Sequence, residues 1–223
     1  MTPFPVERPL DDHAAPFPVE RLEDDARLAR YVDLILASPH NLVSRGARSE
    51  LLTRHVPESL ILASRLPAGP AQVVDIGSGA GLPGLVVALA RPDLAVTLIE
   101  ASAKKARFLE ATAADLEVEV EVVAGRAEDV GRGALAGRFD HATARAVAPL
   151  DRLVPWALPL LRPGGLLHAV KGDRWAQDLA SAARTIERLG ARVVHTPDGS
   201  EAGQGVRVVI IAAPEPLPRR GRG

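Results

Sequence analysis

A glycine-rich segment contains the residues of this chain that are best suited to binding a ligand through their backbone. Val73–Gly84 reads VVDIGSGAGLPG, with an aspartate at position 75 and glycines at alternate positions from 77 to 81. The apolar residues before the glycines predict a strand, and those after them predict a helix. Glycines in a strand-to-helix turn let the backbone approach a ligand closely. We therefore expect a ligand-binding turn here.

Two kinds of ligand are compatible with such a turn. Gly79–Gly84 matches the GxGxxG pattern, so an NAD(P)-binding oxidoreductase or a non-catalytic nucleotide-binding module is one interpretation. Two features favour S-adenosylmethionine instead. Asp75 stands where dinucleotide-binding strands usually stay apolar, and the alternating glycines suit an amino-acid moiety without a pyrophosphate. This second interpretation expects Gly77 and Gly79 to approach the cofactor.

Further candidate cofactor contacts lie at or just after the ends of the neighbouring apolar runs. Glu100 lies 21 residues beyond Gly79, and an acid at the end of a second strand can accept hydrogen bonds from both hydroxyls of a ribose. Ala127 and Glu128 follow the third run, where they could meet an adenine, and Arg145 follows the fourth. Ligands in open α/β sheets bind at the carboxyl ends of the strands. We therefore expect these residues to share one cleft.

The elements that must position these residues alternate along the chain. Five strand–helix units predict a parallel sheet with helices on both faces. Two closing strands, Arg192–His195 and Val206–Ile211, have no helix between them and predict a hairpin. We therefore expect an α/β fold with a seven-stranded, mostly parallel sheet that contains one antiparallel strand. The other predicted strands are Gln72–Ile76, Ala95–Ile99, Val118–Val123, Phe139–Ala144 and Gly165–Val170. The predicted helices are Leu82–Ala90, Ala103–Leu116, Leu150–Leu161 and Trp175–Leu189, with a short helical turn after Val118–Val123 as the fifth.

The sequence before the sheet divides into a tail and a cap. The tail contains the motif PFPVER twice and has seven acidic and two basic residues, a net charge of −5, which predicts disorder. The cap has a helical pattern over Ala26–Ala37 and another over Ser49–Leu66 that is interrupted or bent near Pro57. The predicted divisions are an acidic tail at 1–25, an N-terminal helical cap at 26–67, a Rossmann-like domain at 68–213 and a flexible basic tail at 214–223.

The composition excludes several classes of protein. The 223 residues include no cysteine, which excludes disulfide scaffolds, thiolate metal sites and cysteine nucleophiles, and we expect no metal. Aromatic residues make up 3%, too few for a sheet that stacks bases. No apolar run approaches the roughly 20 residues that cross a bilayer, so we expect a cytoplasmic protein without membrane contact. The net charge of −1 becomes +4 without the acidic tail, which predicts a small basic patch near the cleft.

Together these segments resemble the ribosomal RNA small subunit methyltransferase G family, also known as the glucose-inhibited division protein B family. The similarity runs from about Asn41 to Gly172, and the loop GSGAGLPG followed by Arg91-Pro-Asp93 is its most specific part. Where the family usually has Leu-Leu-Asp-Ser-Leu, this chain has Val56-Pro-Glu-Ser-Leu60. Other matching stretches are Asn41-Leu-Val-Ser44, Arg54-His55, Arg107-Phe-Leu109, Gly125-Arg-Ala-Glu128, Ala144-Arg145-Ala146 and Lys171-Gly172.

The resemblance implies a class I S-adenosylmethionine-dependent methyltransferase that methylates N7 of one guanine in 16S rRNA, free or within the small ribosomal subunit. It also implies cofactor contacts from the residues that match Gly77, Leu82, Ala127, Glu128 and Arg145. Guanine N7 carries an unprotonated lone pair, so its attack on the sulfonium methyl requires no general base, and we assign no catalytic acid or base. A methyltransferase with a small-molecule or protein acceptor is the alternative within this fold.

Several polar or basic residues outside the glycine loop are candidates for substrate contacts. The predicted helix after Glu100 carries Lys104, Lys105 and Arg107, for which an ordinary charged face is favoured over phosphate binding. No feature of the sequence indicates an oligomer interface, so we expect a monomer. The residues that could contact RNA or organise the site are Asn41, Arg54, His55 and Lys171.

Overall fold

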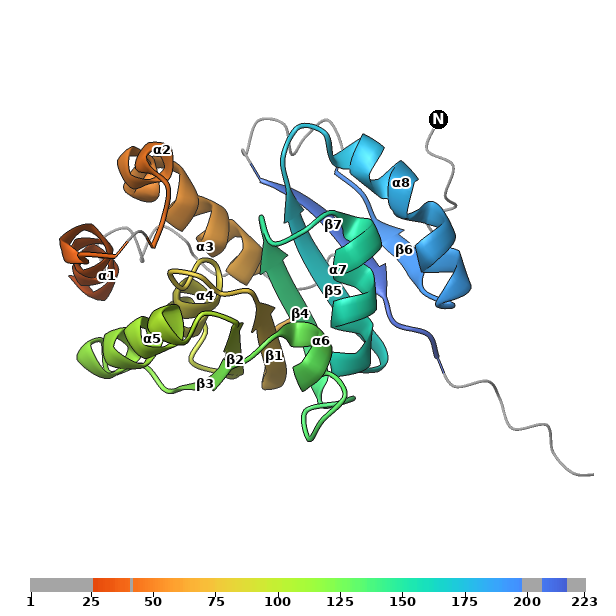
Figure 1. The fold of residues 1–223 in the computed structure, drawn as a ribbon, viewed down its shortest axis with the longest axis horizontal. Helices are drawn as coiled ribbons and strands as arrows, with labels where there is room; N and C mark the ends of the chain where they lie inside the picture. The colour runs from red at the N-terminus through yellow and green to blue at the C-terminus, as the bar shows by residue number, and fades with distance from the viewer. Residues whose placement is uncertain (1–25, 41, 198–205, 216–223) are drawn as a thin grey trace, which may run out of the picture.

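A seven-stranded sheet runs through the centre of the structure, with its strands in the order β3-β2-β1-β4-β5-β7-β6 (Figure 1). The computed structural model describes residues 26–40, 42–197 and 206–215. Strands β1 to β5 are parallel, and β7 is antiparallel to both β5 and β6, so the predicted α/β class and the single antiparallel strand are confirmed. The strands are β1 (Ala71–Ile76), β2 (Leu94–Glu100), β3 (Val120–Ala124), β4 (Phe139–Arg145), β5 (Leu161–Lys171), β6 (Arg192–His195) and β7 (Arg207–Ala212).

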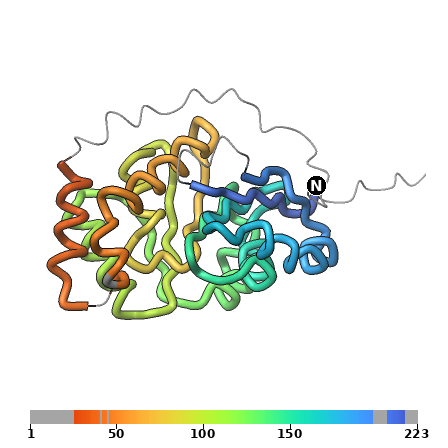
Figure 2. The backbone as a smooth tube through the Cα atoms, turned by 90° about the horizontal axis from the view of Figure 1, so that it is seen from above, coloured from red at the N-terminus to blue at the C-terminus, as the bar shows by residue number. Residues whose placement is uncertain are grey.

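Helices cover both faces of the sheet, as predicted. Because neighbouring residues of a strand point to opposite faces, Val73 and Val74 of β1 belong to two different cores. Helices α1, α3, α4 and α5 surround the first core, and α6, α7 and α8 surround the second. Both views place α1 and α8 at opposite ends of the molecule (Figures 1 and 2). The helices are α1 (Ala26–Ala37), α2 (Arg45–Ser49), α3 (Val56–Arg65), α4 (Gly84–Ala90), α5 (Ala103–Asp115), α6 (Ala127–Val130), α7 (Leu150–Ala157) and α8 (Trp175–Arg188), with a π-helical turn at Leu51–His55 and a 3₁₀ turn at Leu158–Leu160.

The second helix predicted for the cap is divided more than the sequence indicated. Its interruption is a π-helical turn that ends just before Pro57, which itself lies in the first turn of α3. The N–H groups of Arg54 and His55 both donate to the carbonyl of Glu50, at 2.9 and 3.0 Å. Proline has no N–H to donate, so it is tolerated at the start of a helix but not inside one. The break is therefore confirmed, and it lies on the N-terminal side of the proline.

Strand β5 begins earlier than predicted, at Leu161, because that residue pairs with Phe139 before the register shifts in β4. The remaining strands agree with the prediction within one or two residues. The predicted acidic tail at 1–25 lies outside the described residues, and so do Asn41 and the connection 198–205. Of the predicted tail at 214–223, only residues 214 and 215 are described. The division of the chain into four segments stays a prediction.

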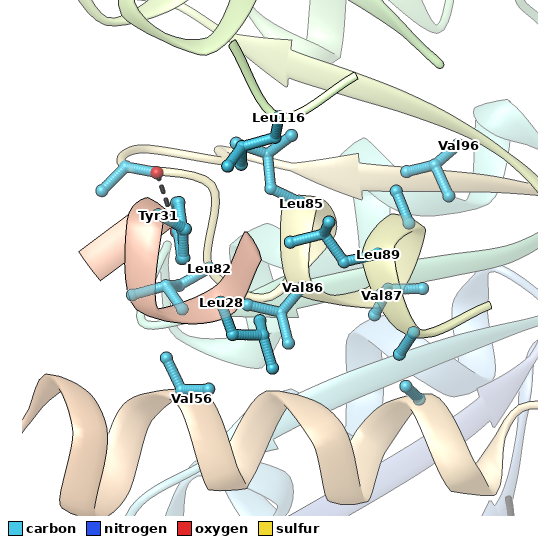
Figure 3. Close-up of a cluster of buried hydrophobic side chains, with 14 of the residues drawn as sticks. Leu28, Tyr31, Val56, Leu82, Leu85, Val86, Val87, Leu89, Val96 and Leu116 are labelled. Atoms are coloured by element: carbon cyan, nitrogen blue, oxygen red, sulfur yellow. Dashed lines mark hydrogen bonds between the residues drawn. The ribbon is translucent and has the colours of Figure 1, made fainter. Parts of the chain in front are cut away.

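Helix α4 is the buried centre of the side that carries the cap. All of its residues are buried, because α1 and α3 cover what the sheet leaves open, and Leu28, Val56 and Val86 belong to this cluster (Figure 3). The hydroxyl of Tyr31, in α1, donates a hydrogen bond of 2.9 Å to the carbonyl of Ala80 in the glycine loop (Figure 3). The cap is thus joined directly to the turn that is predicted to bind the ligand.

Two buried histidines lie side by side on β4 and β5. Nε2 of His168 is 3.2 Å from Nδ1 of His141, and the rings meet edge to face. Burial lowers the pKa of His141 to about 4 and that of His168 to about 3. Among the described residues, Nδ1 of His168 has no hydrogen-bond partner. The folded protein therefore holds both rings neutral at a pH where exposed histidines are protonated.

This pair should make the protein sensitive to mild acid. The unfolded chain takes up protons below pH ~6.5 and the folded chain does not, so stability falls as pH drops from about 6.5 toward 4. Between pH 7.5 and 5, His168→Leu is expected to lose roughly 2 kcal/mol less stability than the wild type, since a pKa unit is about 1.4 kcal/mol. Urea unfolding at the two pH values measures this difference. Equal losses in the two proteins would contradict it.

Candidate active site

The glycine loop closes over the carboxyl ends of β1 and β2. The N–H groups of Gly77 and Ser78 both donate to the carbonyl of Ile99, at 2.8 and 3.0 Å. Gly77 and Gly79 have φ angles of 67° and 60°, a region that favours glycine. A Cβ atom at Gly77 would lie 2.9 Å from Val147, whereas one at Gly79 would meet nothing closer than 3.8 Å. The loop thus presents bare backbone, with open space at Gly79 that a ligand can approach.

Glu100, at the end of β2, is buried beside this loop. One of its carboxylate oxygens accepts a hydrogen bond from the N–H of Gly79 at 2.8 Å, and the other accepts one from the N–H of Ser102 at 2.7 Å. A carboxylate has about four acceptor positions in all. Glu100 is therefore fixed by the backbone on both sides and retains acceptor capacity for a pair of hydroxyl groups. That is the chemistry that ribose recognition requires.

Asp75 anchors the start of α4 from within the sheet. It is fully buried; its Oδ1 accepts a bond of 2.7 Å from the hydroxyl of Thr143, and its Oδ2 accepts one of 3.2 Å from the N–H of Gly84. Burial raises the pKa of Asp75 to about 6, against the opposing effect of these hydrogen bonds. A Cβ atom at Gly84 would lie 2.7 Å from Oδ2. Asp75 thus holds the far end of the glycine loop close to β1.

Arg145, at the carboxyl end of β4, joins the sheet to the cap. Its Nη1 lies 2.8 Å from Nδ1 of His55 and 3.3 Å from Oε2 of Glu58. Glu58 is buried, and its other oxygen accepts a bond of 2.9 Å from Nε of Arg54. Nη1 of Arg54 also reaches Glu50, at 3.0 Å. One buried carboxylate therefore lies between two guanidinium groups and holds Arg145 against the cap.

His55 is an acceptor in this network. The pKa of His55 is lowered, mainly by burial and in second place by the neighbouring Arg145 cation. A guanidinium group can only donate, so Nδ1 of His55 accepts and the ring proton lies on Nε2. His55 therefore orients Arg145, with Nδ1 occupied.

The two residues after Arg145 connect the network to the glycine loop. Ala146 has a φ angle of 55°, a left-handed conformation that costs a non-glycine residue roughly 1–2 kcal/mol. Val147 then packs against Gly77, at the position that a Cβ atom there would need. The position of Val147 over the loop is thus coupled through a short, strained segment to the contact between Arg145 and Glu58.

The other predicted cofactor residues lie where the fold allows a contact. Ala127 and Glu128 form the first turn of α6, directly after β3, at the same edge of the sheet as Glu100. Leu82, within the glycine loop, is 5% exposed, and its side chain belongs to the core around α4. The structure therefore brings Gly77, Gly79, Leu82, Glu100, Ala127, Glu128 and Arg145 to one edge of the sheet.

The predicted substrate residues separate into two groups. Arg54 and His55 belong to the network around Glu58. Lys171 lies at the end of β5, where its ammonium donates to the carbonyl of Ala148 at 2.9 Å and pairs with Asp178 at 2.7 Å. These contacts tie the loop after β4 to α8. Asn41, the fourth candidate, lies outside the described residues.

Three residues that organise the site were not found by sequence analysis. Glu58 follows Arg54 and His55 by four and three positions, the spacing at which side chains on a helix meet, so this signal was available. Tyr31 and Thr143 contact residues that are 49 and 68 positions away in the chain, and nothing local marks them.

The strand order, the glycine loop after β1 and the acid at the end of β2 define the fold of a class I S-adenosylmethionine-dependent methyltransferase. A putative S-adenosyl-L-methionine-dependent methyltransferase from Methanococcus maripaludis superposes with a TM-score of 0.55 at 12% identity, over 77% of this chain and 90% of that one. A branched-chain polyamine synthase mutein from Thermus thermophilus gives a TM-score of 0.59 at 14% identity, over 88% and 67%. At these identities the likeness shows the fold alone.

The chain belongs to the rRNA small subunit methyltransferase G family, whose model matches residues 24–206. A relative of that name from Salinispora tropica is 46% identical over 190 residues, which cover 76% of this chain and 76% of the relative. Another, from Mycobacterium marinum, is 40% identical over 210 residues, which cover 93% and 90%. The protein is accordingly an enzyme with S-adenosylmethionine as its cofactor, and the bare glycine loop with Glu100 beside it fits that group.

Within the described ranges, no helix combines the length and the apolar character that crossing a membrane requires. That part of the chain also contains no group of three or more histidine, aspartate or glutamate residues arranged to hold a metal ion.

Proposed function

We propose that the protein transfers the methyl group of S-adenosylmethionine to N7 of one guanine in 16S rRNA. The observation that carries the proposal is the family match over residues 24–206, which includes the cap as well as strands β1 to β6. The relatives are named ribosomal RNA small subunit methyltransferase G. Ribosomal subunits are made in the cytoplasm, and we propose that the enzyme acts there, as a monomer, on rRNA or on the small subunit.

The chemistry of this reaction places few demands on the protein beyond positioning. The cofactor supplies an electrophilic methyl group on a sulfonium, and guanine N7 attacks it with a lone pair that carries no proton. The protein has to align the two and exclude water. In this proposal Gly77 and Gly79 offer backbone to the amino-acid end of the cofactor, Glu100 accepts from its ribose, and Ala127 and Glu128 border its adenine.

Arg145 completes the cofactor site in this proposal. Because Glu58 and His55 occupy one edge of its guanidinium, only the remaining N–H groups are available to a ligand. Arg54 and His55 then act through Arg145, as residues that position it. Lys171, held by Asp178, stabilises the loop after β4 that carries Val147.

Methyl transfer to unmodified rRNA tests the function directly. Small ribosomal subunits and protein-free 16S rRNA from a strain that lacks this methylation are incubated with the enzyme and S-adenosylmethionine carrying a labelled methyl group. We expect label in one guanosine, recovered as 7-methylguanosine after nuclease digestion and mass spectrometry. Label in another nucleotide or in ribosomal protein would contradict the substrate assignment. Binding of NAD without binding of S-adenosylmethionine would contradict the cofactor site.

A further inference from the structure

A groove of about 460 Å³ lies between the end of α1 and the start of α5, and the function proposed above leaves it unused. Arg30, near the start of α1, pairs with Asp115, at the end of α5, through two bonds of 2.8 Å. Since the end of α1 also lies beside the start of α5, the two helices run side by side in opposite directions. Leu34 and Phe108 contribute apolar surface to the groove, while His40 and two cations contribute polar surface. We call it the α1–α5 groove.

Both walls of the α1–α5 groove are joined to the cofactor cleft. On one side, α1 bonds to the glycine loop through Tyr31 and Ala80. On the other side, the N–H of Ser102, the N-cap of α5, donates to Glu100 at 2.7 Å. A ligand in the groove would therefore lie next to the part of the cleft where Glu100 stands. A substrate that is larger than a single nucleotide also has to contact the surface next to the cleft.

The cations of this groove are available to a ligand. Lys104 and Arg107 are exposed, and in the part of the chain that the structure describes neither one forms an ion pair. By contrast, Arg54 and Arg145 are held by the carboxylate of Glu58. Lys104 also lies in the first turn of a helix of 13 residues, where the macrodipole adds to the attraction for anions.

A second groove differs from the α1–α5 groove in charge. A groove of about 700 Å³ at the amino ends of β1, β2 and β3 is lined by four acids, Asp93, Glu117, Glu119 and Glu121, and by one cation, Arg27. A polyanion is repelled by these acids and attracted by Lys104 and Arg107 in the α1–α5 groove. The small net charge of the chain thus conceals two grooves of opposite charge.

We propose that the α1–α5 groove binds the backbone of the rRNA substrate, with Lys104 and Arg107 contacting phosphates beside the target guanine. The proposal rests on the function proposed above, since it takes rRNA as the substrate. Each of the two cations would contact one phosphate. The apolar surface of the groove, at Leu34 and Phe108, would contact a ribose or the face of a base. The preference for an ordinary charged face, favoured from the sequence, is revised here because these cations line a groove.

The double variant Lys104→Ala/Arg107→Ala tests this proposal. Each phosphate contact contributes about 0.7–0.9 to the slope of log K against log salt, so the slope should fall by roughly 1.4–1.8. At about 0.1 M salt the same contacts account for roughly a 25- to 60-fold loss of affinity for 16S rRNA. The affinity for S-adenosylmethionine, measured by calorimetry on the same preparation, should stay at the wild-type value. Filter binding with protein-free rRNA and with small subunits, each lacking the methyl group, identifies the form that is bound.

Arg184→Ala/Arg188→Ala is the matched control, because it removes the same charge from the exposed face of α8 on the other side of the sheet. We expect it to bind rRNA within twofold of the wild type. An equal loss in both double variants, or a wild-type affinity and salt slope in Lys104→Ala/Arg107→Ala, would overturn the groove proposal while the wild type still methylates rRNA. If the wild type transfers no methyl group to rRNA, the proposed function itself fails, and the groove proposal fails with it.

Discussion

Gly77→Asp is expected to abolish binding of S-adenosylmethionine. The backbone at this position has a φ angle of 67°, and a Cβ atom would lie 2.9 Å from a methyl group of Val147, so the new side chain can fit only if the side chain of Val147 moves. It would also add a negative charge where the carboxylate of the cofactor is expected. An unpaired charge in such a site costs several kcal/mol, and we expect a loss of affinity of roughly 100-fold or more. Calorimetric titration with S-adenosylmethionine measures it.

Gly137→Asp provides a control that separates the cofactor site from backbone strain. Gly137 has a φ angle of 66°, almost the same as that of Gly77, but nothing lies within 4 Å of its added Cβ. It precedes β4, at the edge of the sheet opposite the cleft. This variant carries the same cost for a left-handed side chain and should keep the wild-type affinity for the cofactor. If both variants bind S-adenosylmethionine normally, Gly77 does not border the cofactor.

The glycine loop and Glu100 could be predicted because their signals are local. Alternating glycines after an apolar run require a turn with positive φ angles, and the acid that ends β2 stands at the same edge because parallel strands share their carboxyl ends. The same reasoning predicts the seven strands and one antiparallel strand among them, since a hairpin without a crossover helix reverses direction. These features depend on the type and spacing of neighbouring residues.

The contacts between the cap and the site could not be predicted in this way. Arg145 lies 87 positions from Glu58 and 90 from His55, and these contacts exist only once α3 has packed against the sheet and α4. The π-helical turn that presents His55 depends on two N–H groups sharing the carbonyl of Glu50, which no periodicity reveals. Sequence analysis therefore found Arg54, His55 and Arg145 as separate candidates, and only the fold shows that they form one network.

Glu58→Gln is expected to have the second large effect, because Glu58 is the carboxylate common to Arg54 and Arg145. The amide keeps the shape of the side chain and removes its charge, which leaves Arg145, 16% exposed, without its ion pair. Removing one partner of a buried pair typically costs about 3–5 kcal/mol. We expect the free energy of unfolding to fall by about 3 kcal/mol, measured by urea unfolding at pH 7.5. We also expect weaker binding of S-adenosylmethionine, because a shift of Arg145 would move Val147, two residues further on, which packs against Gly77.

Glu58→Asp distinguishes the charge from the packing, since aspartate is the residue that the resemblance places at this position. It keeps the carboxylate on a shorter side chain, so we expect it to recover most of the stability and of the cofactor affinity that Glu58→Gln loses. A double-mutant cycle with Arg145→Met then isolates the pair. If Glu58 acts through Arg145, the two substitutions together cost less than the sum of their separate effects, by about 1–3 kcal/mol. Additive costs, or equal losses in Glu58→Asp and Glu58→Gln, would show instead that Glu58 supports the cap without positioning Arg145.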